Sequence, residues 1–422
     1  MPEGWAWCRL KQLSLDMADG PFGSNLKAEH YTKNKEARII QLSNIGEYGW
    51  REENIKYTTL EHAKNNISRS IVEPGNVVIA KMMPAGRAII CPNNEKMYVL
   101  SSDAVKLVPT SLINSNYLLN AINSPFFRAS VTDNVQGTTR LRTSISKLRD
   151  CFFPLPPLNE QGLIVNAIEN VISQIDDLEQ NKIDLQNLIT HTKSKILDLA
   201  IHGKLVPQDS TDEPAEELLK RIATCDNRPY KKFDDDIPFS LPQNWEWCYL
   251  GDICKVSSAK RVLQQDWKDS GIPFYRAREI AQLSNSETVK EDLFITPELY
   301  DELKNKYGVP VTGDLMISAV GTIGKVYIVK ESDCFYYKDA SVICFSKKEK
   351  NIDSKYLKLC LESGFLQNQI YSQSTGTTVD TITINKAQEY LFPLPNIKEQ
   401  KRIVSKIEDL FSYLDTISSN LE

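Results

Sequence analysis

The stretch FPLPPLNEQGLIVNAIENVISQIDDLEQNKIDLQNLITHTKSKILDLA, residues 153–200, decides the fold. The prolines at its start cannot sit inside a helix, so they form a rigid lead-in. Asn159 fits a helix N-cap, and Glu160 places negative charge at the positive end of the helix dipole. Behind them, apolar residues recur every fourth and third position, which is typical of a coiled-coil seam. The pattern predicts one helix of about 40 residues and about 60 Å.

This predicted helix needs a partner, because a narrow apolar seam left in water does not stabilise a helix. Only Lys182 and Thr192 interrupt the seam. Polar seam residues either specify helix register or are tolerated where a seam meets water. Gly203 and Pro207 follow as stop signals. The seam residues are Ile164, Ile168, Val171, Ile175, Leu178, Leu185, Ile189, Ile196 and Leu199.

The same signal returns 239 residues later as LFPLPNIKEQKRIVSKIEDLFSYLDTIS, residues 391–418. The repeat includes the proline lead-in, the Glu-Gln pair and the heptad register, so the second helix is the expected partner of the first. Its seam residues are Ile403, Ile407, Leu410, Leu414, Ile417 and Leu421.

The repeat extends over the whole chain. PEGWAWCRL at residue 2 returns as PQNWEWCYL at residue 242, and QGTTRLRTSISK at residue 136 resembles TGTTVDTITINK at residue 375. We expect the paired tryptophans to pack in a core or at a domain edge rather than to stack on bases. The expected parts are a globular block at 1–157, a helix at 158–203, a linker with a short helix at 204–240, a second block at 241–396 and a second helix at 397–422.

The two blocks predict an α+β fold. Short β-branched runs bounded by Gly and Pro indicate strands. The segments that start at Asn114 and Asp353 each predict an amphipathic helix with a capping residue. The expected strands are Asn76–Ala80, Ala88–Cys91, Leu315–Ala319, Val326–Val329 and Ser341–Phe345.

Composition places the chain among globular proteins of two or three domains. It has 422 residues, of which 41% are hydrophobic and 25% charged. No apolar run approaches the length of a membrane span, and the N-terminus does not fit a signal peptide. Nine scattered cysteines and four histidines give no zinc-type spacing, so we expect no metal site, free thiols and a cytoplasmic location.

The net charge of −5 does not exclude nucleic acid, because the acid is unevenly spread. Residues 1–150 carry 19 Lys+Arg against 14 Asp+Glu, whereas residues 151–237 carry 9 against 16. The first block is therefore mildly basic, which permits contact with DNA.

The catalytic motifs that we looked for are absent or have the wrong spacing, and we expect no catalytic residues. GTIGK at residue 321 lacks the spacing of a phosphate-binding loop and favours a turn between strands. NSPF at residue 123 differs from the Asn-Pro-Pro-Phe site of methyltransferases, and no Ser/His/Asp pattern or nuclease cluster is recognisable.

The segment GTTRLRTSISKLR, residues 137–149, is the best candidate for DNA contact, because it could offer Arg to guanine and hydroxyls to phosphates. A solvated loop is the other interpretation. Surface salt bridges are an equal alternative for the two arginines of YRAREI at residue 275. The candidate DNA contacts are Thr138, Arg140, Arg142 and Lys147, with Arg87, Arg276, Arg278, Lys325 and Thr377 from the rest of the two blocks.

Together these motifs resemble the specificity subunit of type I restriction–modification systems. The resemblance rests on the two FPLP…EQ segments, the PEGWAW and PQNWEW openings, GTIGK, and LDLAIHGKLVPQ with DEPAEELLKRI. It covers essentially the whole chain. It implies two target-recognition domains, each reading one half of a split site in double-stranded DNA. Long helices would separate the domains and pair as an antiparallel coiled coil.

The resemblance also implies partners. The paired helices would set the gap between half-sites and dock methyltransferase subunits. The residues expected to pair the two helices are Ile164, Ile168, Val171, Ile175, Leu178, Ile403, Ile407, Leu410, Leu414 and Ile417. S-adenosylmethionine, ATP and Mg²⁺ are expected in the methyltransferase subunits and a motor–nuclease subunit, with no cofactor in this chain. A structural scaffold that binds methyltransferase subunits without reading DNA is the alternative function, and a self-contained restriction enzyme is disfavoured.

The second helix departs from the repeat, because the chain ends at Glu422. We expect the distal half of the first seam, from about Leu185, to lack an intramolecular partner. It would then contact a methyltransferase subunit or a second copy.

Overall fold

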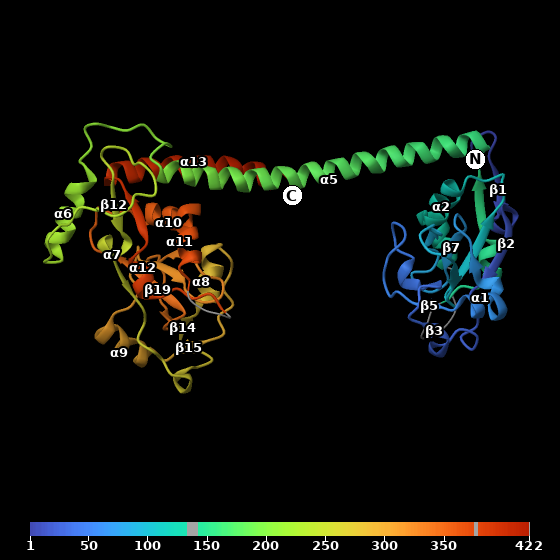
Figure 1. Cartoon of the computed structure of the whole chain (residues 1–422), viewed down its shortest axis with the longest axis horizontal. Helices are drawn as coiled ribbons and strands as arrows, with labels where there is room; N and C mark the ends of the chain where they lie inside the picture. The colour runs from blue at the N-terminus through green and yellow to red at the C-terminus, as the bar shows by residue number, and fades with distance from the viewer. Residues whose placement is uncertain (133–141, 375–378, 422) are drawn as a thin grey trace. The chain divides into compact units, whose positions relative to one another are not determined.

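The computed structural model describes residues 1–132, 142–374 and 379–421 (Figure 1). The chain divides into two compact units, Met1–Glu179 and Gln180–Glu422. Both units mix helices and strands, as the sequence predicts. The long helix α5 (Leu158–Ile201) passes from the first unit into the second.

The first unit contains three small sheets. A two-stranded sheet pairs β1 with β11, a four-stranded sheet has the order β2-β10-β7-β8, and a five-stranded sheet has the order β3-β5-β4-β9-β6. The strands are β1 (Ala6–Arg9), β2 (Ser14–Asp19), β3 (Tyr31–Thr32), β4 (Ala37–Ile40), β5 (Tyr57–Thr58), β6 (Ile71–Val72), β7 (Val77–Ala80), β8 (Ala88–Ile90), β9 (Tyr98–Leu100), β10 (Ala104–Pro109) and β11 (Phe152–Leu155).

Helices cover these sheets and complete the core of the first unit. The α-helices are α1 (Leu60–Asn66), α2 (Ser115–Asn123), α3 (Pro125–Thr132) and α4 (Ile145–Asp150). Short 3-10 turns lie at η1 (Leu10–Leu13), η2 (Ala28–His30), η3 (Leu42–Asn44) and η4 (Ser68–Ser70).

The second unit repeats this plan. Its sheets have the orders β12-β20, β13-β19-β16-β17 and β15-β14-β18. Its strands are β12 (Glu246–Tyr249), β13 (Cys254–Ser257), β14 (Ile272–Tyr275), β15 (Phe294–Ile295), β16 (Leu315–Ser318), β17 (Val326–Ile328), β18 (Tyr336–Tyr337), β19 (Val342–Lys347) and β20 (Leu391–Leu394). Its helices are α6 (Ala215–Cys225), α7 (Leu250–Ile253), α8 (Ala277–Ser284), α9 (Pro297–Tyr307), α10 (Ser354–Glu362), α11 (Gly364–Ser372), α12 (Ile384–Gln388) and α13 (Ile397–Ser419), with a 3-10 turn η5 (Gln264–Asp266).

The duplication holds at the level of register. Cys8 of β1 lies opposite Phe153 of β11, and Cys248 of β12 lies opposite Phe392 of β20. The four-stranded sheets also correspond strand by strand and are antiparallel throughout. The predicted internal repeat is therefore confirmed.

The Glu-Gln pair of each repeat has a specific structural role. Buried Gln161 accepts a hydrogen bond from the backbone N–H of Asn114 at 2.7 Å and donates one to the carbonyl of Pro156 at 3.0 Å. Gln400 does the same with Asp353 at 2.8 Å and Pro395 at 2.8 Å. Each glutamine thereby ties the start of a long helix to the N-cap of a helix in its own unit.

The proline carbonyls are used as well. The hydroxyl of Tyr117 donates to the carbonyl of Pro154 at 2.9 Å, and Tyr356 donates to Pro393 at 3.0 Å. Proline has no N–H to donate to a neighbouring strand, so the hydrogen-bond ladder is interrupted at these residues. Their carbonyls are then available to the two tyrosine hydroxyls. Burial of the Tyr117 hydroxyl raises its pKa to about 12, so it remains a donor.

Each predicted amphipathic helix is in fact two helices. The break falls at Ser124 between α2 and α3, and at Ser363 between α10 and α11. Both serines have extended backbone angles, and each hydroxyl accepts from the N–H three residues on. The prediction missed the break because a Ser N-cap inside an apolar pattern leaves the periodicity intact.

Tryptophan burial differs between the repeats. Trp245 and Trp247 are buried, whereas Trp5 is half-buried and Trp7 is half exposed against Phe126 and Phe152. Trp245 and Trp247 therefore pack in a core, whereas Trp7 packs at an edge with half of its surface exposed.

Helix α13 packs along the end of α5 in the second unit (Figure 1). Ile196 and Ala200 share one buried cluster with Ile403 and Ile407. Lys193 forms an ion pair with Asp415, and Gln208, just beyond α5, bonds to Glu399. Because the earlier residue of one helix meets the later residue of the other, the pair is antiparallel.

Our prediction about the unpaired half of the seam is wrong. The distal half of α5 is the paired half, and Ile189 and Ile196 are buried there. In an antiparallel pair, α13 starts beside the end of α5 and ends at Ser419, about one turn past Asp415. The second-helix seam is buried at Ile403 and Ile407 and half-buried at Leu410 and Leu414.

The proximal seam residues that we assigned to helix pairing are placed differently. Val171, Ile175 and Leu178 are 55%, 48% and 68% exposed. Ile164 packs against the core of the first unit, and Ile168 is half-buried. At the other end of the predicted pair, Ile417 is 44% exposed.

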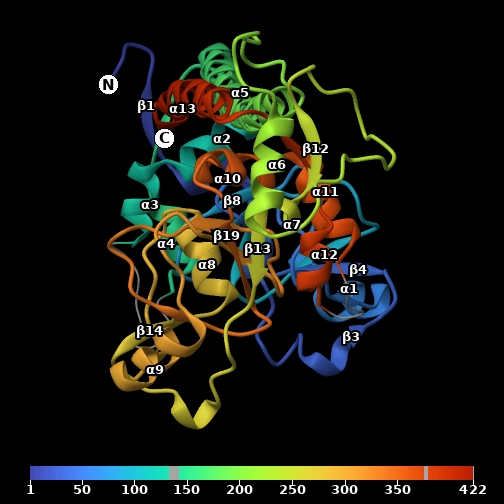
Figure 2. The ribbon, with the colours of Figure 1, turned by 90° about the vertical axis from the view of Figure 1, so that its left-hand side faces the viewer.

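Helix α6 is the short helix of the linker and lies beside α7 in the second unit (Figure 2). In the segment before it, the buried carboxylate of Asp212 accepts from Arg402 of α13 at 2.8 Å. This ion pair fixes the linker to the second long helix. Within the described residues, no helix is both long and apolar enough to cross a membrane.

Replacing Gln400 with Ala should destabilise the second unit by about 2–4 kcal/mol, because a buried N–H and a buried carbonyl lose their partners. Gln161→Ala should have the same effect on the first unit. Urea denaturation followed by tryptophan fluorescence measures both. Gln186→Ala, on the exposed face of α5, is the control and should leave the midpoints unchanged. An unchanged midpoint for Gln400→Ala would contradict the anchoring role.

Candidate nucleic-acid interface

Each unit has an outer sheet, which is the five-stranded sheet in the first unit and the three-stranded sheet in the second. Each outer sheet contains one pair of parallel strands. In the first unit β4 runs parallel to β9, and in the second β14 runs parallel to β18. The segment that follows β4 or β14 packs against the four-stranded sheet. Ile45 does so beside Val78 and Ile89, and Ile280 does so beside Met316 and Tyr327. These two segments occupy equivalent places.

The equivalent segments begin alike and then diverge. The buried Asn44 side chain accepts from the N–H of Gln41 at 2.8 Å, and buried Glu279 accepts from the N–H of Arg276 at 2.8 Å. After this turn, the first unit makes a loop closed by a bridge between Ile45 and Trp50, whereas the second continues as α8.

A basic cluster lies on the loop of the first unit. Arg128 of α3 pairs through both of its terminal nitrogens with the carboxylate of Glu47. Arg87 and Arg51 add further positive charge near the same carboxylate. The hydrogen bonds from Arg128 lower the pKa of Glu47, so it stays ionised. Three guanidinium groups therefore lie near Glu47. Arg51 also pairs with Glu53 at 3.7 Å, which leaves the cluster of three arginines and two carboxylates with one net positive charge.

Arg87 is the least compensated member of this cluster. Burial lowers its pKa, the charge of Glu47 opposes that effect, and Arg128 and Arg51 add to it. Its Nε atom is buried and lacks a hydrogen-bond partner within the part of the chain that the structure describes. A buried donor without a hydrogen-bond partner costs free energy, so an arginine of this kind is stabilised when it gains an acceptor.

A glycine turn presents Arg87 and its counterpart Lys325. Gly86 has φ +83° and Gly324 has φ +80°, backbone angles that residues with a side chain rarely adopt. Each glycine N–H donates to the strand before it, at 2.9 Å, to Ala80 and to Ser318 respectively. The two turns are therefore equivalent, and Lys325 is exposed.

Helix α8 of the second unit borders a shallow pocket of about 290 Å³. Arg278 and Gln282 line it from the helix, Asn285 and Glu287 line it from the segment that follows, and Val320 and Thr322 line it from the glycine turn. Amide side chains can pair with adenine in two directions at once, and Arg can pair with guanine. The lining thus has the functional groups that read base edges.

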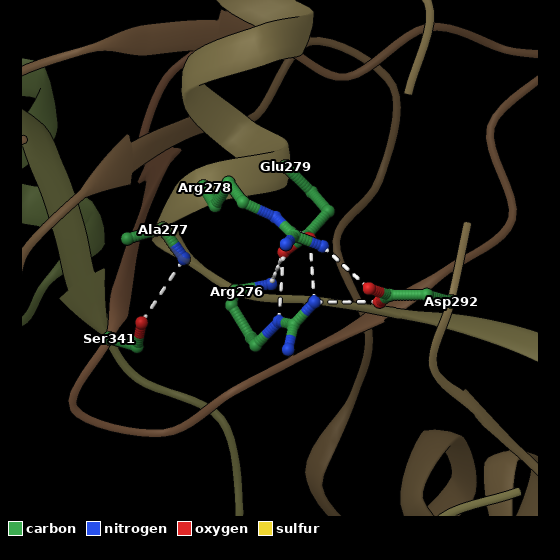
Figure 3. A network of polar contacts seen from close by, with 6 residues as sticks. All are labelled: Arg276, Ala277, Arg278, Glu279, Asp292 and Ser341. Carbon is green, nitrogen blue, oxygen red and sulfur yellow. Dashed lines mark hydrogen bonds and ion pairs between the residues drawn. The ribbon is translucent and has the colours of Figure 1, made fainter. Parts of the chain in front are cut away.

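Arg276 and Arg278 are held in an ionic network (Figure 3). Arg276 contacts Glu279 at 2.8 Å and Asp292 at 2.7 Å, and Arg278 contacts the same two carboxylates at 2.7 and 2.8 Å. The N–H of Ala277 donates to the hydroxyl of Ser341 at 3.1 Å. The network fixes the start of α8, and the Arg278 side chain is still 56% exposed.

The remaining sequence candidates fall partly within the described residues. Arg142 is half exposed, forms an ion pair with Asp103 at 2.9 Å and lies beside Met82. Lys147 is half-buried on α4. Thr138, Arg140 and Thr377 lie outside the described residues. Whether any of these residues contacts DNA stays a prediction.

Sequence reasoning missed the members of both sites that come from distant segments. Arg51 and Arg128 join Arg87 from two other parts of the chain, and Gln282 and Asn285 lie on a helix that showed no motif. Only the internal repeat carried a signal, since Gly86-Arg87 matches Gly324-Lys325. Among the described residues, no group of three or more His, Cys, Asp or Glu could hold a metal ion.

The family model for the type I restriction modification DNA specificity domain matches residues 26–187 and 242–422. The chain belongs to this family. The model thus matches twice, once in each half of the internal repeat. Members of this specificity family supply sequence recognition rather than catalysis, and this chain is a noncatalytic specificity subunit.

Relatives of the specificity family agree in sequence and in fold. The chain is 25% identical to the type I restriction enzyme EcoAI specificity subunit of Escherichia coli, over 97% of this chain and 78% of that protein. The crystal structure of the HsdS subunit from Thermoanaerobacter tengcongensis has a TM-score of 0.57 at 16% identity, covering 100% and 94% of the two chains. A chain from a structural study of complex assembly in the type I R-M system has a TM-score of 0.54 at 17% identity, covering 100% and 93%.

Acid should weaken the Arg276–Arg278 network of the specificity subunit. Burial raises the pKa of Glu279, but hydrogen bonds from Arg276 and Arg278 outweigh it and leave the pKa below its ordinary value. The network therefore stabilises the fold above the unfolded pKa, and this contribution is lost as pH falls through the folded pKa.

Glu279→Gln should lower the urea midpoint of the second unit at pH 7, because two arginines lose a buried anion. Denaturation at several pH values between about 7 and 3 should show a smaller acid-dependent loss in this variant than in the wild type. Glu331→Gln, at an exposed position, is the control. Equal acid dependence in Glu279→Gln and the wild type would contradict the assignment.

Proposed function

We propose that this chain is the DNA sequence-specificity subunit of a type I restriction–modification complex and reads a bipartite site. Each unit would read one half-site. The observation that carries this proposal is the retained framework of the two units combined with divergence after β4 and β14. Two domains that recognise different sequences need a common support and different reading residues.

Charge supports DNA as the ligand of the first unit. Arg51, Arg87 and Arg128 lie near Glu47 and outnumber the two carboxylates, Glu47 and Glu53, that accompany them, although the whole chain is acidic. A local excess of arginine suits a phosphate backbone and guanine edges. The functional groups in the α8 pocket suit base edges in the second unit.

We further propose that the long helices dock methyltransferase subunits. Val171, Ile175 and Leu178 lie at seam positions and are largely exposed. A coiled-coil seam left in water favours a partner helix. The structural neighbour from the study of type I complex assembly is consistent with such a role. A second copy of this chain is the competing occupant.

The catalytic groups would belong to other subunits. In this proposal the methyltransferase subunits hold S-adenosylmethionine, and a motor–nuclease subunit holds ATP and Mg²⁺. The nine free cysteines of this chain suit a reducing, cytoplasmic setting. A scaffold that binds methyltransferase subunits without reading DNA remains the alternative function, and it predicts no sequence preference.

A selection experiment tests DNA reading. The chain, purified with its methyltransferase subunits, should enrich one split sequence from a random duplex pool, with two short specified blocks separated by unspecified base pairs. Quantitative sequencing of the bound fraction gives the result. The same methyltransferase subunits without this chain are the control and should enrich nothing. Enrichment of no sequence by the complete complex would favour the scaffold.

Helix α5 should set the gap between half-sites. Deleting residues 169–175 removes one heptad, keeps the seam in register and shortens the helix by about 10 Å, or roughly three base pairs. The selected half-sites should stay the same while the gap shortens. Replacing the seven residues with another heptad of equal length is the control. An unchanged gap after deletion would contradict the spacing role.

A further inference from the structure

The internal repeat itself separates two kinds of contact residue. Where both units keep a feature, it serves a task common to both half-sites. Where they differ, it serves the sequence that each unit reads. This reasoning rests on the proposed DNA-reading function. Applied to the glycine turns and the segments beside them, it assigns roles to individual residues.

The retained feature is a basic residue directly after a left-handed glycine. Arg87 and Lys325 follow Gly86 and Gly324, and the carbonyls of both basic residues accept from the preceding strand, at 2.8 Å from Ala80 and 3.0 Å from Ser318. The hairpin geometry is the same in the two units. Arg and Lys share a charge but not a hydrogen-bonding shape, and Lys cannot reproduce a planar guanidinium fork.

The neighbouring residues differ between the units. Counted from the shared caps at Asn44 and Glu279, Glu47 occupies the position of Gln282. The first unit surrounds this position with Arg51 and Arg128. The second unit places Asn285 and Arg278 there, around the α8 pocket. At position 367, the counterpart of Arg128, a glutamine donates instead to the carbonyl of Gly324 at 3.1 Å.

We propose that Arg87 and Lys325 are paired phosphate anchors, one for each half-site, and that Gln282 and Asn285 read bases in the half-site of the second unit. A phosphate contact needs a positive charge at a fixed place and carries no sequence information. Base reading needs a defined arrangement of donors and acceptors. The shared charge and the divergent amides meet these two requirements.

The surroundings of Arg87 support an anchor. Glu47 is already engaged by both terminal nitrogens of Arg128, so it does not saturate Arg87. The buried Nε of Arg87 has no partner among the described residues, and two further arginines lie near the same carboxylate. An approaching phosphate would relieve the like-charge repulsion among the three arginines.

The surroundings of the second site support reading by amides. Gln282 lies in the last turn of α8, and Asn285 caps the end of the helix three residues later, where its side-chain amide donates to Glu287 at 2.9 Å. Both side chains line the α8 pocket. The ionic network of Arg276, Arg278, Glu279 and Asp292 fixes the start of this helix (Figure 3). A rigid support lowers the entropic cost of placing donors and acceptors against a base edge.

Salt titration separates the two roles. In the complete complex, Arg87→Gln and Lys325→Gln should each weaken binding to every duplex by about 3- to 10-fold. Each should reduce the slope of log Kd against log salt by about one, because one phosphate contact is lost. The sequence selected from a random pool should not change. Arg87→Lys should keep the slope, since it keeps the charge.

Gln282→Ala and Asn285→Ala should behave in the opposite way. The salt slope should stay unchanged, while discrimination at one or two positions of a single half-site falls by about 5- to 150-fold. The other half-site should be selected as in the wild type. Competition between duplexes that differ at one base pair measures this discrimination.

Matched controls lie on the opposite face of each outer sheet. Helix α1 packs there through Ala63 and Ile67 in the first unit, and α9 packs there through Leu303 in the second. Lys64 and Lys304 are exposed on these helices. Lys64→Gln and Lys304→Gln remove the same charge and should change neither slope nor selected sequence.

Three results would overturn the assignment. Either an unchanged salt slope in both Arg87→Gln and Lys325→Gln, or a shifted base preference in either, would exclude the anchor role. An unchanged preference in both amide variants would exclude base reading. Failure of the wild-type complex to select any sequence would instead contradict the proposed function, and the slopes on one fixed duplex would still test the anchors.

Discussion

The structure depends on one side-chain amide used twice. Gln161 and Gln400 each join the proline lead-in of a long helix to the N-cap of a helix in the adjoining unit. Both amides are buried, so neither can exchange these bonds for water without cost. A long helix attached at one point would otherwise pivot about its first turn. The amide, together with the tyrosine hydroxyl on the proline carbonyl, fixes the direction of each helix relative to the unit in which it begins.

This constraint explains why the framework is duplicated while the recognition surface is not. The strand pairs, glycine turns and amide anchors correspond across the two units because each supports a helix in the same way. The segments after β4 and β14 do not support a long helix, and their packing role is to bury Ile45 and Ile280. One became a loop with arginines around Glu47, and the other became a helix with amides. The two units therefore differ mainly in segments that do not hold the long helices in place.

The long helices illustrate how direction decides pairing. A heptad seam shows that a helix needs a partner, but the seam is the same whichever end the partner approaches. Because α13 follows the second unit, it begins beside the end of α5 and covers Ile189 and Ile196. The apolar residues nearer the start of α5 stay exposed, which makes them available to another subunit. The error about which half is paired came from matching the helices by repeat position rather than by antiparallel direction.

The sequence by itself determined the duplication, the α+β class, the long helices and the family, because these depend on local periodicity and on motifs in a fixed order. It also gave Arg87 and Lys325 as candidate contacts through the repeat, and Arg278 through the YRAREI segment. Only the tertiary structure decided which half of α5 is paired, where α2 ends and α3 begins, and that Arg51 and Arg128 join Arg87 around one carboxylate. These outcomes depend on contacts between residues far apart in the chain. Such contacts leave no periodic signal, because each participant is set by its own local element and the meeting is set by packing.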